Sequence, residues 1–301
     1  MSLLVTGSIG IDTVTTPFGT SENCLGGSAI YFSMAASYFC PVRFSGVVGM
    51  DCPFNLAETF KGRDVDLSGL EIRQGSKTFR WKGSYHNTMK NAITDNVELN
   101  VLMEKPAKVP IEFMDSKFVF LANTSPVLQM EILDQLDSPV FVAADTMNCW
   151  IDGHLEDLKK LMKKINALII NEDEARSITK ESNLIITAEK ILEMGPDVVI
   201  IKKGEYGSMM CNKDGDIFVL PAYIAREVKD PTGAGDSFAG AFMGYLTKQG
   251  KVNTANLKKA IAYGTVMASF TISDFSLAGL TGINNKVIES RFEKLREITQ
   301  F

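Results

Sequence analysis

The heptapeptide at residues 230–236 reads Asp230-Pro231-Thr232-Gly233-Ala234-Gly235-Asp236. Its glycines, Gly233 and Gly235, let the backbone turn tightly and approach a ligand without interference from a side chain. Beyond them, apolar residues recur at the spacing of a buried helix: Phe238, Ala241, Phe242, Tyr245 and Leu246. The turn is therefore expected at a helix N-terminus, where unpaired N–H groups and the helix dipole attract an anion.

Asp236 falls in the first turn of the predicted helix, where the dipole is expected to keep its carboxylate ionised. A carboxylate beside an anion-binding turn suits phosphoryl transfer. The backbone from Gly233 through Ala234 to Gly235 would hold the phosphoryl group, and Asp236 would take the proton of the attacking hydroxyl group. The alternative is an ordinary glycine turn capped by an aspartate, which a G-x-G pattern alone favours.

The complete heptapeptide resembles the C-terminal signature of the ribokinase-like (PfkB) family of small-molecule kinases, D-[TP]-[TNV]-G-[AS]-G-D, and fits it at every position. The resemblance implies ATP-dependent phosphoryl transfer to a hydroxyl or hydroxymethyl group of a sugar or sugar-like molecule, with Mg²⁺ as cofactor. A nucleoside kinase is the alternative within the family. A non-catalytic ligand sensor on the same fold is the alternative outside the enzyme class, but a sensor would not need to keep Asp236 beside the anion-binding turn. Neither a P-loop nor a G-x-G-x-x-G motif occurs in the chain.

The composition is that of an ordinary soluble protein of 301 residues, 45% hydrophobic and 22% charged, with a net charge of −5. A negative chain without a basic block argues against a nucleic-acid partner. No stretch approaches the roughly 20 apolar residues of a membrane span, and the first residues lack the features of a signal peptide. The five cysteines are scattered, as is typical of free thiols in a reducing compartment. We therefore expect a cytoplasmic protein whose partner is a small molecule.

Short apolar runs alternate with helical patterns along most of the chain. Strands are expected at 3–6, 42–48, 117–121, 140–144, 167–170 and 198–202, and helices at 29–40, 127–136 and 155–165. Repeated βα units of this length predict a mainly parallel sheet with helices on both faces. The family resemblance implies a ribokinase-like three-layer αβα fold, in which residues 1–301 form one domain that carries a small β-sheet lid.

Residues 77–85 alternate aromatic and polar side chains, which predicts antiparallel strands rather than a helix. In the family such an insertion forms the lid, expected here at about residues 13–18 and 71–102. A lid excludes water, which would otherwise compete as the phosphoryl acceptor. Trp81 and Tyr85 are candidates to line it, and plain cross-strand packing is the alternative for each. Because family lids often form dimer interfaces, we expect a monomer or a lid-mediated homodimer.

Asp12 follows the first predicted strand, near the edge of the sheet where ligands collect in α/β folds. It could accept hydrogen bonds from two sugar hydroxyl groups, or it could merely cap a turn. The segment Gly7-Ser8-Ile9-Gly10-Ile11-Asp12 resembles the family pattern G-[SE]-x-x-x-D, which implies the substrate-binding role. Gly26 and Gly27 resemble the Gly-Gly motif at which substrate approaches the backbone. Tyr31 replaces the Asn of many members, and an aromatic ring there would stack on a substrate ring or narrow the pocket.

Two further strand ends supply residues that the resemblance assigns to ATP. Asn171 and Glu174 match N-x-x-E, whose Glu acts on Mg²⁺ through water, although their acidic segment is also a good helix start. Lys202, Gly204 and Gly207 match [TK]-x-G-x-x-G, a nucleotide-contacting turn in which the lysine would neutralise phosphate charge. The predicted ATP contacts within the heptapeptide are Thr232, Gly233 and Gly235.

Three further acidic residues have weaker interpretations. Asp230, together with Thr232, stands beside the anion-binding turn, and the resemblance implies a monovalent cation there, such as K⁺. Asp145 follows a strand where many members have D-x-N-x-R, but the Arg is missing here, so the motif gives Asp145 little weight. Asp51 is expected only in the wall of the pocket.

Overall fold

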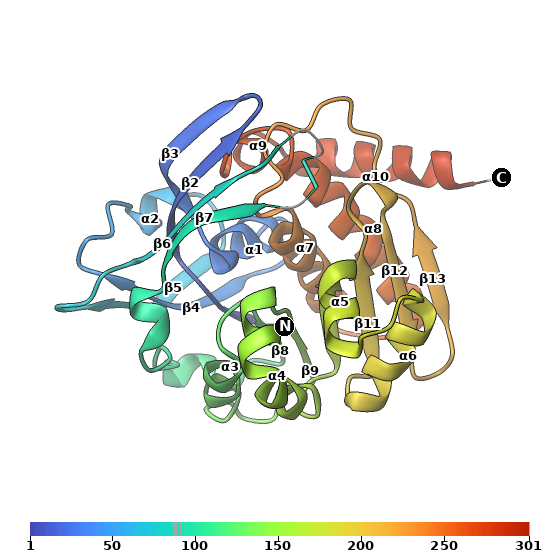
Figure 1. Ribbon diagram of the computed structural model, residues 1–301, viewed down its shortest axis with the longest axis horizontal. Helices are drawn as coiled ribbons and strands as arrows, with labels where there is room; N and C mark the ends of the chain where they lie inside the picture. The colour runs from blue at the N-terminus through green and yellow to red at the C-terminus, as the bar shows by residue number, and fades with distance from the viewer. Residues whose placement is uncertain (87–88, 91, 301) are drawn as a thin grey trace.

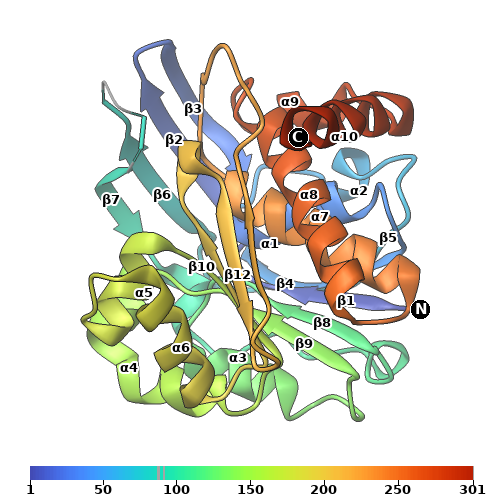
Figure 2. The same ribbon diagram turned by 90° about the vertical axis from the view of Figure 1, so that its right-hand side faces the viewer.

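A large sheet with helices on both faces makes up most of the molecule, and a smaller sheet stands beside it (Figures 1 and 2). The computed structural model describes residues 1–86, 89–90 and 92–300. Within them, the large sheet has the order β13-β12-β11-β10-β9-β8-β1-β4-β5. Its strands are β1 (Leu3–Thr6), β4 (Val42–Gly49), β5 (Val65–Arg73), β8 (Phe118–Leu121), β9 (Phe141–Ala144), β10 (Ala167–Asn171), β11 (Val198–Lys202), β12 (Ser208–Asn212) and β13 (Ile217–Leu220).

The strands from β5 to β11 run parallel, and β12 and β13 continue the sheet in antiparallel fashion. All the predicted strands are present. Parallel strands end at the same edge of a sheet, and the register aligns their last residues: Leu121 pairs with Ala144, and Asn171 with Lys202. Asp145 comes directly after Ala144. The sheet therefore places Asp145, Asn171 and Lys202 along one edge, as expected for an α/β fold.

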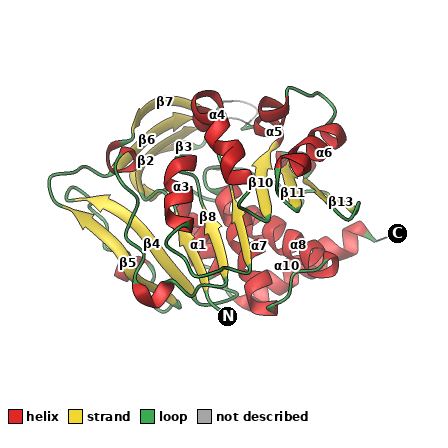
Figure 3. Ribbon diagram, turned by 90° about the horizontal axis from the view of Figure 1, so that it is seen from below, coloured by secondary structure: helices red, strands yellow, loops and turns green. Residues whose placement is uncertain are grey.

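Helices cover both faces of this sheet, as predicted. In Figure 3, α3 to α6 lie on one side of the strands, and α7, α8 and α10 on the other. The core follows this division, because Leu3 and Val5 pack in one apolar cluster while Leu4, between them, packs in the other. The helices are α1 (Ser28–Ala36), α2 (Leu56–Thr59), α3 (Pro126–Leu133), α4 (Asn148–Met162), α5 (Glu172–Thr179), α6 (Leu184–Met194), α7 (Ala234–Gln249), α8 (Thr254–Thr271), α9 (Ala278–Thr281) and α10 (Asn285–Thr299).

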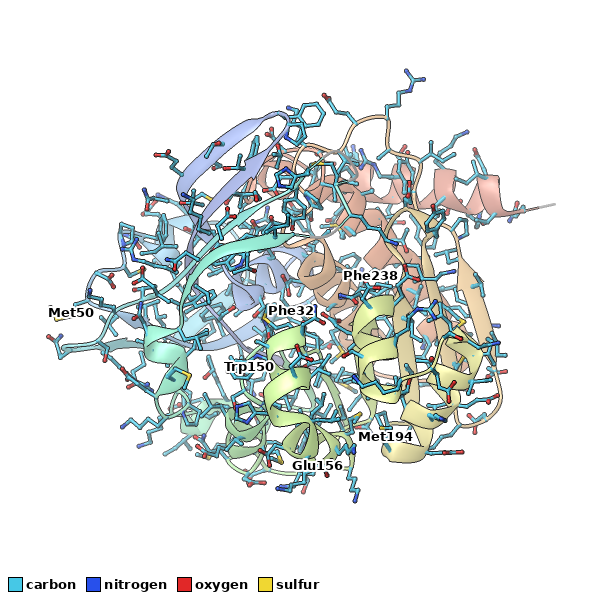
Figure 4. All side chains as sticks on the ribbon, viewed as in Figure 1. Phe32, Met50, Trp150, Glu156, Met194 and Phe238 are labelled. Atoms are coloured by element: carbon cyan, nitrogen blue, oxygen red, sulfur yellow. The ribbon has the colours of Figure 1, made fainter. Side chains whose placement is uncertain are left out.

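Helix α1 packs closely against α7, and Figure 4 labels Phe32 of α1 and Phe238 of α7. Every residue of α1 is buried. A Cβ atom on Gly240 of α7 would lie 2.2 Å from the carbonyl oxygen of Phe32, so only glycine allows this approach. One turn further along, a Cβ atom on Gly244 would lie 3.1 Å from the carbonyl oxygen of Ala36. Glycines on α7 thus set the distance between the helices.

The smaller sheet has the strand order β3-β2-β6-β7 in the described residues and lies at the upper left of Figure 1. Its strands are β2 (Gly10–Thr16), β3 (Gly19–Gly26), β6 (Phe79–Ser84) and β7 (Ile93–Glu98). β2 pairs with β6 in parallel and with β3 in antiparallel fashion, and β6 and β7 form an antiparallel pair. We call this sheet the lid.

The lid differs in extent from the predicted segments 13–18 and 71–102. β3 has no counterpart in the prediction, because its sequence Gly-Thr-Ser-Glu-Asn-Cys-Leu-Gly is polar and largely solvent-facing, with no apolar alternation. Residues 71–73 belong to β5 of the large sheet, and η1 (Asn100–Met103) follows β7. Residues 87–88 and 91 of the predicted segment lie outside the described residues.

The three predicted helices also differ from their expected bounds. The helix expected at 29–40 ends at Ala36 and continues as turns, and the helix expected at 127–136 spans Pro126–Leu133. The helix expected at 155–165 begins at Asn148 and ends at Met162. Non-helical backbone angles at His154 interrupt α4, which explains why the apolar periodicity becomes clear only after this residue. The remaining short helices are η2 (Ile111–Phe113) and η3 (Gly204–Tyr206). Among the described residues, no helix combines the length and the apolarity needed to cross a membrane.

The contact between α1 and α7 predicts the effect of two matched substitutions. Gly240→Ala should destabilise the protein by about 1–3 kcal/mol, because its methyl group would overlap the backbone of α1. Gly244→Ala should be nearly neutral, because the milder contact is offset by the higher helix propensity of alanine. Urea unfolding of both variants measures the difference. Equal stabilities of Gly240→Ala and the unmodified chain would show that the close approach is not needed.

Candidate active site

The turn at residues 231–235 leads directly into α7, as the sequence predicts. Gly233 precedes the helix with a φ of 75°, a left-handed conformation that glycine adopts without strain. A Cβ atom on Gly233 would lie 2.3 Å from the ring of Tyr31, and one on Gly235 would lie 2.7 Å from Lys202 Nζ. Because these two positions are glycines, the Tyr31 ring and Lys202 can lie close to the start of α7. We call this turn, where the sequence predicts that first-turn N–H groups bind an anion, the anion-binding turn.

Asp236 lies in the first turn of α7, close to the charge of Lys202. Burial raises the pKa of the Asp236 carboxyl group, while the charge of Lys202 and the backbone N–H of Asp236 lower it. The sequence predicts an ionised carboxylate from the helix dipole alone, and the structure adds burial, which acts in the opposite direction. A carboxylate whose pKa lies above that of an exposed aspartate is the stronger base.

Asp145 and Glu174 complete an acidic cluster around Lys202. Burial raises the pKa of Asp145 well above its ordinary value, the charges of Asp236 and Glu174 raise it further, and Lys202 opposes them. Burial likewise raises the pKa of Glu174 against the charge of Lys202. Asp145 Oδ1 is buried without a hydrogen-bond partner in the part of the chain that the structure describes. This cluster of carboxyl groups around one ammonium group favours additional positive charge in a ligand.

Asn171 and Glu174 form a reciprocal cap at the start of α5. The Glu174 N–H donates to Asn171 Oδ1 at 2.8 Å, and the Asn171 N–H donates to Glu174 Oε2 at 2.8 Å. The helix-start interpretation of this motif is therefore correct, and it leaves Glu174 Oε1 outside the cap. Next to it, Glu172 forms an ion pair at 3.1 Å with Lys90, which lies between the lid strands β6 and β7. This ion pair joins the connection between these strands to the helix that carries Glu174.

Asp12 lies on β2, 4% exposed, and its carboxylate occupies the space beside Gly26. A Cβ atom on Gly26 would lie 1.8 Å from Asp12 Oδ2. Burial and the charges of Asp236 and Asp230 raise the pKa of Asp12 to about 7, and the N–H of Gly27 opposes them. Asp12 Oδ1 has no hydrogen-bond partner among the described residues. It is therefore free to accept a hydrogen bond from a ligand hydroxyl group.

Trp81 stands next to Asp12 on the lid. The parallel register of β2 and β6 pairs the two residues, so their side chains share one face of the lid. Trp81 Nε1 donates to Thr94 Oγ1 at 3.2 Å, and the ring covers Gly83, where a Cβ atom would lie 2.2 Å away. Cross-strand packing of Trp81 is thus present, on the face that carries Asp12.

The Tyr31 side chain is buried inside the protein and does not line an open pocket. Its side chain is 2% exposed, and its ring lies against Gly233. Burial and the charges of Asp12 and Asp230 raise the pKa of the Tyr31 hydroxyl group, and a hydrogen bond with Ser276 opposes them. Tyr31 therefore contacts the anion-binding turn from α1.

The turn after β11 carries Lys202, Gly204 and Gly207. Both glycines have left-handed backbone angles, with φ of 56° and 82°. A Cβ atom on Gly207 would lie 2.0 Å from the carbonyl oxygen of Leu220. The Lys203 N–H donates to the Gly207 carbonyl at 2.7 Å, which closes the turn. The glycines are needed for this turn, and Lys202 leaves it toward α7.

Asp230 is 1% exposed and organises the loop before α7. Its Oδ1 accepts a hydrogen bond from the Thr232 N–H at 2.9 Å, and its Oδ2 accepts one from the Ser276 N–H at 3.4 Å. Burial raises the pKa of this carboxyl group, and these hydrogen bonds oppose the rise. Asp230 therefore joins the anion-binding turn to the loop between α8 and α9.

Two acidic residues have contacts that their sequence motifs do not indicate. Asp145 received little weight because its motif lacks the Arg, yet its position after β9 brings it to Asp236 and Lys202, and a strand-end position was the available signal. Asp51 was expected in the pocket wall but instead anchors the lid: it accepts hydrogen bonds from the Thr78 N–H at 2.7 Å and from Arg80 at 3.2 Å.

A family model described as pfkB family carbohydrate kinase matches residues 12–280. The chain belongs to this family. It is a small-molecule kinase, with ATP as co-substrate. The chain is 28% identical to a cytidine kinase of Thermococcus kodakarensis over 251 residues, which cover 81% of this chain and 87% of the relative.

Solved structures share the fold at lower sequence identity. A nucleoside kinase of Burkholderia thailandensis, solved in complex with inosine, has a TM-score of 0.78 and 18% identity, and the match covers 97% of this chain and 98% of that one. A ribokinase of Cryptococcus neoformans var. grubii serotype A, solved with ADP, has a TM-score of 0.78 and 20% identity, with 96% and 99% covered. Both are similar to this kinase over nearly its whole length.

The burial of Asp12 predicts how the stability of this kinase depends on pH. The native Asp12 keeps its proton up to a pH of about 7, whereas the unfolded chain releases it near the ordinary aspartate pKa of 3.8. The native state therefore loses stability between these pH values, by at most about 1.4 kcal/mol per pH unit. Asp12→Asn removes this loss, so its melting temperature relative to the unmodified kinase should rise from pH 4 to pH 8. A difference in melting temperature between the two proteins that is the same at every pH from 4 to 8 would contradict the raised pKa of Asp12.

Proposed function

We propose that this kinase transfers the γ-phosphoryl group of ATP to a hydroxyl group of a nucleoside, with a free sugar as the second acceptor class. The carrying observation is Asp236, a half-buried carboxylate in the first turn of α7, beside the anion-binding turn and Lys202. Two observations favour a nucleoside. The cytidine kinase relative matches 81% of the chain, and Trp81 offers an aromatic ring on the face of the lid that carries Asp12.

In the proposed reaction, the acceptor hydroxyl oxygen forms a bond to the γ-phosphorus as the bond to the β-phosphate oxygen breaks, giving ADP and the phosphorylated acceptor. Asp236 takes the hydroxyl proton. The N–H groups of the turn from Gly233 to Gly235 and the ammonium group of Lys202 stabilise the negative charge of the transferring group. Asp12 holds a second acceptor hydroxyl group, which fixes the reacting one near Asp236.

Mg²⁺ is the proposed cofactor, and the acidic cluster fits it. Within the described residues, no group of three or more His, Cys, Asp or Glu side chains is arranged to hold a metal ion directly. Mg²⁺ commonly keeps several waters and uses one or two carboxylates with substrate phosphates, so Asp145 and Glu174 are suitable partners. When bound with ATP, Mg²⁺ neutralises phosphate charge. Asn171 fixes Glu174 for this role through the cap on α5.

The proposal extends to compartment and assembly. We place the kinase in the cytoplasm, supported by cysteines that are free in the described residues: Cys24, Cys40, Cys52, Cys149 and Cys211. The oligomeric state is a monomer or a homodimer formed through the lid. The outer strand β7 supports the lid as the contact surface, because all its residues are exposed and Ile93 and Val97 are apolar.

The direct test is ADP release from Mg-ATP in the presence of cytidine, inosine, adenosine or D-ribose. Acceptor-dependent release with a nucleoside supports the proposal, and release with D-ribose alone selects the sugar class. Intact ATP binding without release for any sugar or nucleoside in a broad panel would contradict the proposal.

Asp236→Asn should lower the turnover number by roughly 10²–10⁴-fold, because the variant cannot take the proton of the acceptor. ATP binding should remain nearly unchanged, since the turn and Lys202 are intact. Steady-state kinetics and calorimetric ATP binding measure the two effects. Asp214→Asn on the exposed surface is the matched control and should behave like the unmodified kinase. Wild-type turnover in Asp236→Asn would remove the base assignment.

A monovalent cation is proposed beside Asp230 and Thr232, and replacing K⁺ in the assay tests it. The carboxylate of Asp230 is buried and joins the anion-binding turn to the loop at Ser276, so a cation there would steady both. Turnover should fall when choline replaces K⁺, and Asp230→Asn should lose this dependence. Activity that is unchanged without K⁺ would argue against the site.

A further inference from the structure

A chain of hydrogen bonds connects two ends of the lid through the loop before α7. The Ser276 hydroxyl donates to the carbonyl oxygen of Leu25, in β3, at 2.7 Å. The Ser276 N–H donates to Asp230 Oδ2, and Asp230 Oδ1 accepts from the Thr232 N–H. A hydrogen bond of 3.3 Å then joins the Thr232 hydroxyl to the hydroxyl of Tyr85. Asp230 is the central acceptor of this chain.

The backbone of Tyr85 continues the lid strand β6. It directly follows β6, and its N–H donates to the Thr15 carbonyl at 2.8 Å, which extends the pairing of β6 with β2. Its side chain is 9% exposed. The hydroxyl group therefore leaves a well-fixed backbone and reaches Thr232, two residues before the start of α7.

Tyr31 contacts the same turn from another side. Its ring lies against Gly233. Two tyrosines therefore hold the turn between Asp230 and Gly233, one from the buried helix α1 and one from the lid. The contact from α1 is fixed by the core, whereas the contact from Tyr85 exists only while the lid is in place.

We propose that Tyr85 is a positioning residue that holds the lid closed on the anion-binding turn through Thr232, so that phosphoryl transfer to the acceptor is favoured over transfer to water. The inference rests on the proposed function and identifies what couples the lid to the phosphoryl site. Tyr85 acts through Thr232 and Asp230 and takes no proton from the acceptor. Loss of its hydroxyl group lets the lid open more often while the turn keeps its support from Tyr31.

Opening of the lid changes which oxygen attacks the phosphoryl group. With the lid closed, the acceptor hydroxyl group forms the new bond to the γ-phosphorus. With the lid open, a water oxygen forms that bond as the bond to the β-phosphate oxygen breaks, and the products are ADP and inorganic phosphate. The ratio of hydrolysis to transfer therefore reports the closed fraction of the lid, and a substitution that only lowers stability would not change it.

The test compares Tyr85→Phe with the unmodified full-length kinase. Acceptor-independent phosphate release is measured with Mg-ATP alone, and transfer is measured with whichever of cytidine, inosine or D-ribose gives most ADP. One hydrogen bond is worth about 2- to 10-fold in the ratio of open to closed lid. Tyr85→Phe should raise the ratio of hydrolysis to transfer by this factor and raise the KM of the acceptor, with ATP affinity unchanged. Tyr245→Phe, which removes the same oxygen far along α7, should change neither.

Thr232→Val removes the same hydrogen bond from the other side and should raise the ratio of hydrolysis to transfer by the same factor, which serves as the test if Tyr85→Phe does not fold. Because Thr232 is also a predicted ATP contact, only this ratio is compared for Thr232→Val. The double substitution should change the ratio no further than either single one, because both remove one interaction. An unchanged ratio in Tyr85→Phe, or effects that multiply in the double variant, would overturn the inference. Absence of acceptor-dependent ADP release from the unmodified kinase would instead contradict the proposed function itself.

Discussion

The close packing of α1 against α7 is the constraint on which the active site depends. Gly240 lets the backbones approach, and at the N-terminal end of the same contact Gly233 accepts the ring of Tyr31. Because α1 follows Gly26 and Gly27, which lie beside Asp12, this one helix pair sets the position of the Asp12 carboxylate relative to the anion-binding turn. A larger residue at Gly240 or Gly233 would move both halves of the site.

The second requirement is electrostatic. Several carboxyl groups converge at the edge of the sheet, and burial raises the pKa of Asp12, Asp145 and Asp236. Lys202, which lies beside Gly235, opposes this rise in pKa at Asp145 and Asp236. Holding buried carboxyl groups together lowers the stability of the folded protein, and a positively charged ligand group would offset this loss. The carboxyl groups that destabilise the ligand-free protein therefore favour binding of a cation together with phosphate.

Local patterns in the sequence predict the parts of this site that local chemistry determines. The start of α7 follows from its glycines and the apolar stripe after them, and the cap of α5 follows from Asn171 and Glu174. The polar strand β3 escapes prediction because it lacks apolar alternation. Contacts such as Tyr31 with Gly233, or Tyr85 with Thr232, join residues distant in sequence, and only the tertiary packing of helices and lid determines them.

The most direct test of the central claim is a crystal structure with Mg²⁺, a non-hydrolysable ATP analogue and the acceptor that supports most ADP release. The terminal phosphate should lie within about 3 Å of the N–H groups of Gly233 to Gly235, with one acceptor hydroxyl group about 3 Å from Asp236 and another on Asp12. A nucleotide bound away from the start of α7, or an acceptor turned away from Asp236, would contradict the proposed phosphoryl transfer.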